Sequence, residues 1–141
     1  MVKYWLMITD EENWEVIKTW HVYGTKTEKL ISELKQGDKV VMYLIRTQIS
    51  GLFEIESLKS NKNIRFNDEE YKFFIDLKPI KILKKTINIT SKWDNPKIIE
   101  NVSIFKNSLR WGTILMGRSI IEITKDDYEY IKGQVDNVGI K

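Results

Sequence analysis

The feature that most constrains the fold is a shift in the phase of apolar residues at Pro79. Within residues 73–83, apolar side chains first occupy odd positions and then, beyond the proline, even ones: Phe73, Ile75 and Leu77, then Ile80 and Ile82. Side chains of a strand alternate between its two faces, so this shift predicts a bulge or bend at the proline. A long strand that turns a corner predicts a curved, mostly antiparallel sheet that closes toward a small β-barrel.

Four other segments predict strands. Residues 4–8 (YWLMI) and 39–46 (KVVMYLIR) are short, nearly continuous apolar runs, which is typical of strands covered on both faces. Residues 51–57 (GLFEIES) alternate between apolar and acidic side chains, which indicates one face in water. Residues 119–124 (SIIEIT) predict a further strand near the end of the chain.

Three segments predict helix starts, because each sets a threonine three residues ahead of an acid. Thr9, Thr25 and Thr124 begin these segments, and the spacing is that of a capping box. Apolar residues at helical spacing follow each one, which predicts helices of about ten residues. Gly37 predicts a left-handed cap that ends the second helix. The whole pattern predicts an α+β fold with about three short helices at the rim of the sheet.

Composition limits the class of protein. The chain has 141 residues, of which 42% are hydrophobic and 30% charged, so we expect one folded domain over residues 1–141. No apolar run approaches the ~18 residues of a membrane span, and the N-terminus lacks a signal peptide, which predicts a soluble, cytoplasmic protein. With no cysteine and one histidine, we expect no disulfide, metal or cofactor.

The charge pattern suits a phosphate-bearing partner without requiring one. The net charge is +3, and four lysines with no acid lie between Lys78 and Lys85. Lys106, Arg110 and Arg118 form a second basic group. Simple solvation of the lysines is an equally good interpretation of the first group.

Few residues could carry catalysis. His21 lies between Trp20 and Val22, and a lone histidine in such a setting is more often structural than a general base. Asp126 and Asp127 fall in a predicted first helical turn, where the helix dipole accounts for them. A glycine loop that cradles phosphate is absent from the sequence. We therefore expect a protein that is not an enzyme.

Aromatic residues are the better candidates for a binding site. The chain has five tryptophans and six tyrosines, of which Trp5 and Trp14 are predicted to lie in the core. Tyr23 precedes Gly24 and a predicted helix start, so a base stacked on its ring could be read by nearby backbone N–H groups. Trp111 is the first candidate for a second aromatic residue that would sandwich the base. An equally good interpretation is that Trp111 packs beneath the last strands.

These motifs, in this order and spacing, resemble the EVE domain, especially its short archaeal-type stand-alone form. The resemblance covers residues 3–132 through the segments YWLMITDEENWEVIK, VYGT, LKQGDKVVMYL, ISGLFEIES and RWGTILMGRSIIEITKDDYEYI. It implies a PUA-like fold, a small curved β-barrel with helices at its rim, related to the YTH domain that reads methylated adenine in RNA. It also implies binding of a modified base in DNA or RNA in an aromatic pocket.

The resemblance also implies a set of binding residues. They are Thr9, Asp10, Asn13, Trp14, Tyr23, Gly24, Thr25, Trp111, Gly117 and Arg118. Many relatives have tryptophan at the position of Tyr23, and many bacterial ones read KSEP where this chain reads ITDE. The resemblance implies that Arg118 contacts a phosphate group of the nucleic acid.

The sequence therefore predicts a module that binds DNA or RNA and recognises a modified or flipped-out base. Two alternatives stay open: a protein that binds a small ligand or nucleoside in the same pocket, and a structural interaction domain whose aromatic residues are core. A membrane partner is not expected, and a partner protein such as a nuclease is left open. The type of nucleic acid, the base modification and the oligomeric state are not determined by the sequence.

Overall fold

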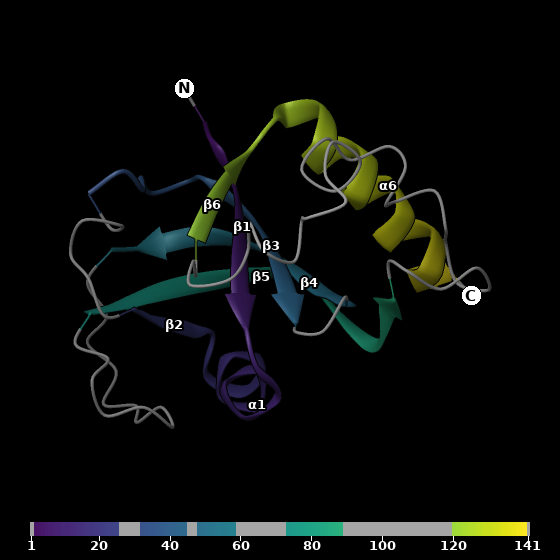
Figure 1. Cartoon of the computed structure of the whole chain (residues 1–141), viewed down its shortest axis with the longest axis horizontal. Helices are drawn as coiled ribbons and strands as arrows, with labels where there is room; N and C mark the ends of the chain where they lie inside the picture. The colour runs from purple at the N-terminus through teal and green to yellow at the C-terminus, as the bar shows by residue number, and fades with distance from the viewer. Residues whose placement is uncertain (1, 26–31, 45–47, 59–72, 89–119, 141) are drawn as a thin grey trace, which may run out of the picture.

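The computed structural model describes residues 2–25, 32–44, 48–58, 73–88 and 120–140 (Figure 1). They contain six strands, namely β1 (Tyr4–Thr9), β2 (Val22–Thr25), β3 (Lys39–Leu44), β4 (Gln48–Ser57), β5 (Phe73–Asn88) and β6 (Ile120–Ile123). Two helices lie in the same part of the chain, α1 (Glu11–Trp20) and α6 (Lys125–Ile140).

The strands form one sheet in the order β2-β5-β4-β3-β1-β6. β1 and β3 are parallel, and the other neighbouring pairs are antiparallel. The sheet curls so far that the hydroxyl of Tyr23, on the edge strand β2, donates to the carbonyl oxygen of Ile8 on β1, across three intervening strands. The predicted α+β class with a curved, mostly antiparallel, PUA-like sheet is confirmed, with two described helices beside it (Figure 1).

The predicted irregularity at Pro79 is a bulge in β5. On β4, Leu52 and Phe53 are consecutive, but their partners on β5 are Lys81 and Pro79, so Ile80 is an extra residue. A bulge bends its strand and increases the local twist. The shift of apolar phase in the sequence was therefore a correct signal of where the sheet turns.

Gly51 allows the two longest strands to approach each other at this turn. A Cβ atom on Gly51 would lie 2.8 Å from the carbonyl oxygen of Lys81, which is closer than real Cβ contacts come. Glycine has no Cβ, so the backbone of β5 can come close here. A larger residue at this position would push the strands apart.

Each face of the sheet carries its own apolar cluster. The cluster on the side of α1 includes Trp5, Met7, Trp14, Ile17, Val40, Met42, Phe53, Ile55 and Leu77. The cluster on the side of α6 includes Leu6, Val41, Tyr43, Leu52, Leu83, Tyr128, Ile131 and Val135. Successive residues of β1 and β3 alternate between the two clusters, which confirms that both strands are covered on both faces. Burying one such side chain contributes roughly 1.5–3 kcal/mol.

The alternation in β4 is confirmed as well. Phe53 and Ile55 are buried, whereas Glu54 is half-buried and Glu56 exposed. Glu54 lies between two lysines of the neighbouring strands.

Across the sheet, Glu54 pairs in register with Lys39 on β3 and Lys78 on β5. The Nζ atom of Lys39 donates to the Glu54 carboxylate. This hydrogen bond, opposed by partial desolvation and aided by the charges of Lys39 and Lys78, holds the pKa of Glu54 below its ordinary value.

The two helix starts differ in how well the sequence predicted them. Thr124 caps α6 as predicted, since its Oγ1 accepts from the N–H of Asp127 at 3.0 Å. For α1 the prediction was wrong by one residue. Thr9 ends β1, and Asp10 is the cap, with its Oδ1 accepting from the N–H of Asn13 at 2.8 Å. Thr9 is paired with Leu44 of β3 as the last residue of β1, so the next residue, Asp10, is the one that caps the helix.

The second predicted helix differs from the structure where it can be compared. Thr25 ends a strand, and residues 32–38 form turns instead of the end of a helix; residues 26–31 lie outside the described part of the chain. Gly37 has a positive φ of 92°, as predicted, but it serves the turn that leads into β3. Its N–H donates to the carbonyl oxygen of Ile55, which attaches the turn to β4.

Asp38 is the buried polar centre of this region, with 1% of its surface exposed. Its Oδ1 accepts from the N–H of Lys3 at 3.0 Å. Its Oδ2 accepts from the indole N–H of Trp5 at 2.9 Å and from the N–H of Lys35 at 3.0 Å. One carboxylate thus joins the start of β1, the preceding turn and the start of β3.

We expect Asp38→Ala to lower the free energy of unfolding by about 3 kcal/mol or more, since it removes three hydrogen bonds to a charged acceptor and leaves the Trp5 N–H buried without one. Asp38→Asn should cost about half as much. All three partners are donors, and an amide presents only one oxygen to them. Urea unfolding followed by fluorescence measures both values. The exposed Glu56→Ala is the control, and equal values for all three variants would contradict the assigned role.

Tyr128 packs α6 against the start of the sheet. Its ring lies 5.0 Å from that of Tyr4, centroid to centroid, and 3% of the residue is exposed. Burial, assisted by the charge of Glu129, raises the pKa of Tyr128 to about 12 from the ordinary value of 10.0. The fold therefore favours the neutral phenol.

Because the pKa in the folded state is the higher one, this contribution to stability is complete below pH 10 and is lost as the pH rises toward 12. In Tyr128→Phe the group is absent, so the free energy of unfolding should fall less steeply over this range than in the wild type. Urea unfolding at a series of alkaline pH values measures the two slopes. Tyr130→Phe, on the same helix, controls for the loss of a hydroxyl; parallel curves for wild type and Tyr128→Phe would contradict the expectation.

Candidate functional site

The end of β1 and the start of α1 bring three of the predicted binding residues together. Thr9 Oγ1 donates to the carbonyl oxygen of Asp10 at 3.2 Å, and Asp10 caps the helix through the N–H of Asn13. Thr9 and Asn13 are each 5% exposed. The result is a compact group of buried polar atoms at a helix N-terminus.

Tyr23 joins this group from the opposite edge of the sheet. Its hydroxyl donates to the carbonyl oxygen of Ile8 at 2.7 Å, one residue before Thr9. The residue is 3% exposed and belongs to the apolar cluster on the side of α1. In this structure the ring of Tyr23 is therefore buried, and its hydroxyl reaches the backbone at the end of β1.

Trp14 packs on the same side of the sheet. It is 5% exposed, and its ring meets that of Phe53 edge to face, with centroids 6.1 Å apart and an interplanar angle of 83°. This geometry is favourable for aromatic pairs. Trp5 is also buried, so the prediction that Trp5 and Trp14 lie in the core is confirmed.

Gly24 and Thr25 lie in β2, where they pair with Phe74 and Phe73 of β5. Their backbones thus belong to a strand ladder, whereas the sequence predicted that they lead directly into a helix start with unpaired N–H groups. The pairing of β2 with β5 joins residues about 50 positions apart in the chain, so the local sequence around Gly24 could not predict it. Trp111, Gly117 and Arg118 lie outside the described residues.

The end of α1 sets the position of β2. His21 adopts a left-handed conformation (φ 58°, ψ 45°), and its N–H donates to the carbonyl oxygen of Ile17 at 2.8 Å, which closes the helix. Its own carbonyl oxygen accepts from the N–H of Leu77 on β5 at 2.8 Å. The backbone of His21 thus directs the chain from α1 into the sheet.

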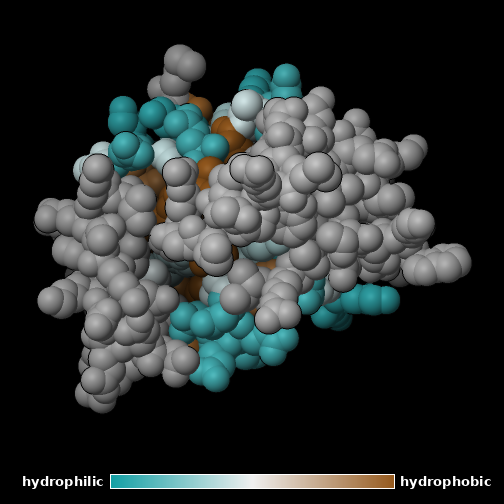
Figure 2. All heavy atoms as spheres, in the orientation of Figure 1, coloured by the Kyte–Doolittle hydropathy of each residue, from teal (hydrophilic) through white to brown (hydrophobic). Residues whose placement is uncertain are grey.

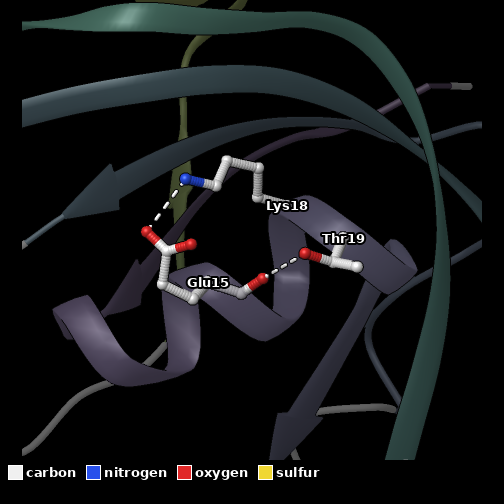
Figure 3. A network of polar contacts seen from close by, with 3 residues as sticks. All are labelled: Glu15, Lys18 and Thr19. Atoms are coloured by element: carbon white, nitrogen blue, oxygen red, sulfur yellow. Dashed lines mark hydrogen bonds and ion pairs between the residues drawn. The ribbon is translucent and has the colours of Figure 1, made fainter.

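The outer side of α1 is polar. Lys18 Nζ lies 2.9 Å from Glu15 Oε1, and Thr19 Oγ1 donates to the carbonyl oxygen of Glu15 at 2.8 Å (Figure 3). Figure 2 shows hydrophilic atoms along the lower edge of the molecule, over α1. Trp20, the last residue of this helix, departs from that character because it is 53% exposed.

With the fold and these residues established, the chain can be compared with known proteins. A sequence profile of the EVE domain matches residues 3–134. The chain belongs to the EVE domain family. A UPF0310 protein of Pyrococcus horikoshii is 32% identical to this EVE domain, over 92% of its length and 96% of the relative. A second UPF0310 protein, from Pyrococcus abyssi, is 29% identical over 93% and 98% of the two chains.

Solved structures of YTH domains have the same fold. The Mmi1 YTH domain superposes with a TM-score of 0.69 at 20% identity, covering 99% of this EVE domain and 78% of the other chain. The Pho92 YTH domain, solved in complex with m6A, gives a TM-score of 0.64 at 13% identity, with 95% and 83% covered. At these identities the likeness establishes the fold.

Neither a metal centre nor a membrane span is found in the described part of the chain. Among its residues, no group of three or more His, Cys, Asp or Glu side chains is arranged to hold a metal ion. Its helices are all too short or too polar to cross a bilayer.

The sequence indicated Trp20, together with Tyr23, as an aromatic residue that could stand at the mouth of a pocket, but the set of binding residues implied by the resemblance does not include it. The spacing of Trp14, Ile17 and Trp20 suggests one helix face, and the first two are indeed buried. The helix ends at Trp20, however, because His21 turns the chain away. The spacing alone therefore could not predict that Trp20 is exposed.

A pair of substitutions tests whether Asp10 stabilises the protein only as the cap of α1. Asp10→Ala should lower the free energy of unfolding by about 1 kcal/mol, because it removes the acceptor for the Asn13 N–H. Asp10→Ser keeps such an acceptor without the charge and should be close to wild type. Thermal or urea unfolding checks both. If the serine variant is as unstable as the alanine variant, the carboxylate does more than cap the helix.

Proposed function

We propose that this EVE domain binds nucleic acid and holds one modified or flipped-out base beside Tyr23, without making or breaking bonds. The observation that carries the proposal is the junction of β1, α1 and β2. There the hydroxyl of the buried Tyr23 is bound to the carbonyl oxygen of Ile8, one residue before the buried Thr9 and close in the chain to the cap of α1. A flat apolar wall next to a few polar groups is suited to a nucleobase.

The fold supports the same proposal. YTH domains with this architecture were solved in complex with RNA, in the case of Mmi1, and with m6A, in the case of Pho92. This chain shares their arrangement of strands over nearly its whole length. We transfer from them the class of ligand and not the individual contacts.

Stacking would supply much of the affinity. A base on an aromatic ring is stabilised by roughly 1–3 kcal/mol, and hydrogen bonds to its edge add selectivity. Thr9 and Asn13, which are buried at the end of β1 and the start of α1, are the side chains that we propose for these hydrogen bonds. A methyl group on the base would add apolar contact inside the same cluster.

The burial of Tyr23 has a kinetic consequence. Because the residue is 3% exposed, the side chains that cover it have to move before a base can stack on its ring. Binding should therefore include an opening step, and its observed rate should level off as the oligonucleotide concentration rises. A rate that rises linearly throughout would show that the base binds elsewhere.

Two other functions make different predictions from the same residues. A nucleoside-binding protein would hold the free modified nucleoside as tightly as the oligonucleotide, with little dependence on salt. A structural interaction domain would use Tyr23 only as core, so a variant would lose stability and no binding. The burial of Tyr23 is what a structural interaction domain would require, so the experiment has to test that function as well.

The test compares Tyr23→Leu with Tyr23→Phe. Tyr23→Leu removes the flat ring and should abolish any preference for a modified base, a loss of about tenfold or more in relative affinity. Tyr23→Phe keeps the ring and removes the hydrogen bond to Ile8, so it should keep the preference while losing about 1 kcal/mol of stability. Fluorescence anisotropy with methylated and unmethylated DNA and RNA, single- and double-stranded, measures the preference.

The controls for this test are folding and salt. Circular dichroism and thermal unfolding show whether each variant is folded at the temperature of the assay. If a folded Tyr23→Leu protein keeps the full preference, the base is not held by this ring. If the wild type binds every oligonucleotide equally, recognition of a modified base is excluded.

A further inference from the structure

The outer edge of β5 carries the lysines that the sequence placed together. β5 pairs with β4 on one side, and on the other side β2 covers only residues 73–76. From Lys78 onward, no other described strand pairs with this second edge. We call Lys78, Lys81, Lys84 and Lys85 the lysine row. Between residues 78 and 85 the sequence has no acid.

The lysine row is accessible to a partner. Lys78, Lys84 and Lys85 are exposed, and Lys81 is half-buried. Next to them, Ile82 and Leu83 pack against the clusters on opposite faces of the sheet. Consecutive residues here thus point to opposite faces, and the lysines flank the edge from both sides. Their long side chains allow the ammonium groups to reach past the backbone edge.

The acid that faces Lys78 on the neighbouring strand β4 is already paired with another lysine. Glu54 lies across from Lys78 in register, but its carboxylate already accepts from Lys39. Two lysines around one carboxylate leave a net positive charge at this end of the row. The rest of the row adds three charges along the same strand.

An exposed aromatic residue lies at the beginning of the lysine row. The carbonyl oxygen of His21 accepts from the N–H of Leu77. Trp20 and Lys78 are the next residues on the two sides of this contact, so the backbone at the end of α1 lies beside the start of the row. Leu77 packs in the cluster on the side of α1, so Lys78 leaves the strand toward the other face, and its long side chain has to reach around the edge. Trp20 is 53% exposed and Ile80, at the bulge, 42%. The edge therefore combines an aromatic surface with a line of cations.

We propose that Trp20 and the lysine row form a binding track for single-stranded nucleic acid, with phosphates along β5 and a base stacked on Trp20. The inference rests on the proposed function and adds a second surface to it, apart from the ring of Tyr23. Fully extended, Lys78 to Lys85 would span at most roughly 23 Å at about 3.3 Å per residue, and the register shifts at Ile80 and between Ile82 and Ile87 shorten it to a length that suits a few nucleotides. Aromatic platforms beside cationic grooves are the usual means of binding single strands without reading their sequence.

Lysines on a strand edge also have a simpler use, because they prevent the edge from pairing with other chains. That use does not require an exposed tryptophan at the end of the row. It is also satisfied by one or two charges of either sign, whereas this edge has four of one sign. The combination favours an anionic, partly aromatic ligand.

The first test neutralises three lysines of the row. The variant Lys81→Gln, Lys84→Gln, Lys85→Gln leaves Lys78 in place because of its position across from Glu54. Its matched control carries Lys3→Gln, Lys35→Gln and Lys125→Gln, three exposed lysines elsewhere. Anisotropy with unmodified single-stranded RNA and DNA of about eight nucleotides is recorded over a range of salt concentrations.

We expect the row variant to bind at least tenfold more weakly than the wild type, with the control within about threefold. The slope of log affinity against log salt should become shallower by about 2, at roughly 0.7 for each phosphate that a lysine no longer neutralises. Equal weakening in both triple variants would overturn the track, because only net charge would then matter. If polyglutamate displaces the labelled oligonucleotide as well as an unlabelled oligonucleotide does, the assignment to nucleic acid is overturned.

The second test replaces Trp20. Trp20→Ala should weaken binding of the same oligonucleotides by about tenfold and leave the salt slope unchanged, because stacking involves no counterion release. Ile80→Ala, which removes the other exposed apolar side chain of this edge, is the control and should bind like the wild type. Equal affinity of the two variants would overturn the role of Trp20.

Failure of this inference can be told apart from failure of the proposed function. If the wild type prefers a modified base through Tyr23 while the row variant binds normally, only the track is overturned. If no oligonucleotide binds the wild type at all, the proposed function fails, and the track fails with it.

Discussion

The buried carboxylate of Asp38 is the constraint on which the arrangement of the sheet depends. Its two oxygens accept three N–H groups, from Lys3, Trp5 and Lys35, so the start of β1 is held beside the start of β3. Those strands are parallel, and α1 and β2 lie between them in the chain. A parallel pair needs a long connection. The hydrogen bonds of Asp38 fix the start of β1 in the sheet, and the direction of the strand then sets where its other end and the candidate site lie.

At that other end, one set of atoms holds the fold and forms the candidate site. Asp10 caps α1, His21 closes it, and the hydroxyl of Tyr23 binds the carbonyl oxygen of Ile8. The base proposed for this site would lie against side chains that also stabilise the curl of the sheet. Recognition and stability are coupled at Tyr23, whereas Trp20 and the lysine row lie on the surface, where charge and stacking can change with little effect on the core.

Much of the fold could be predicted where the controlling interaction is local. The bulge near Pro79, the alternation in β4 and the cap at Thr124 all follow from spacing within a few residues. Long-range contacts overruled the local pattern elsewhere. Asp10 replaced Thr9 as the cap because β1 runs one residue further, and the turns before Gly37 are held by contacts with β4 and Asp38. The candidate site was predictable only as a set of residues, through the resemblance to EVE domains.

The sequence by itself determined the class of fold, the two-faced burial of β1 and β3, the place where β5 bends and the collection of lysines on that strand. Period and composition carry these features, because side-chain direction follows from position along a strand. Only the tertiary structure decided that VYGT is an edge strand, that Tyr23 is buried against the end of β1 and that Trp20 is exposed. These outcomes depend on which strands pair and on where a helix stops, and both are set by contacts between residues far apart in the chain.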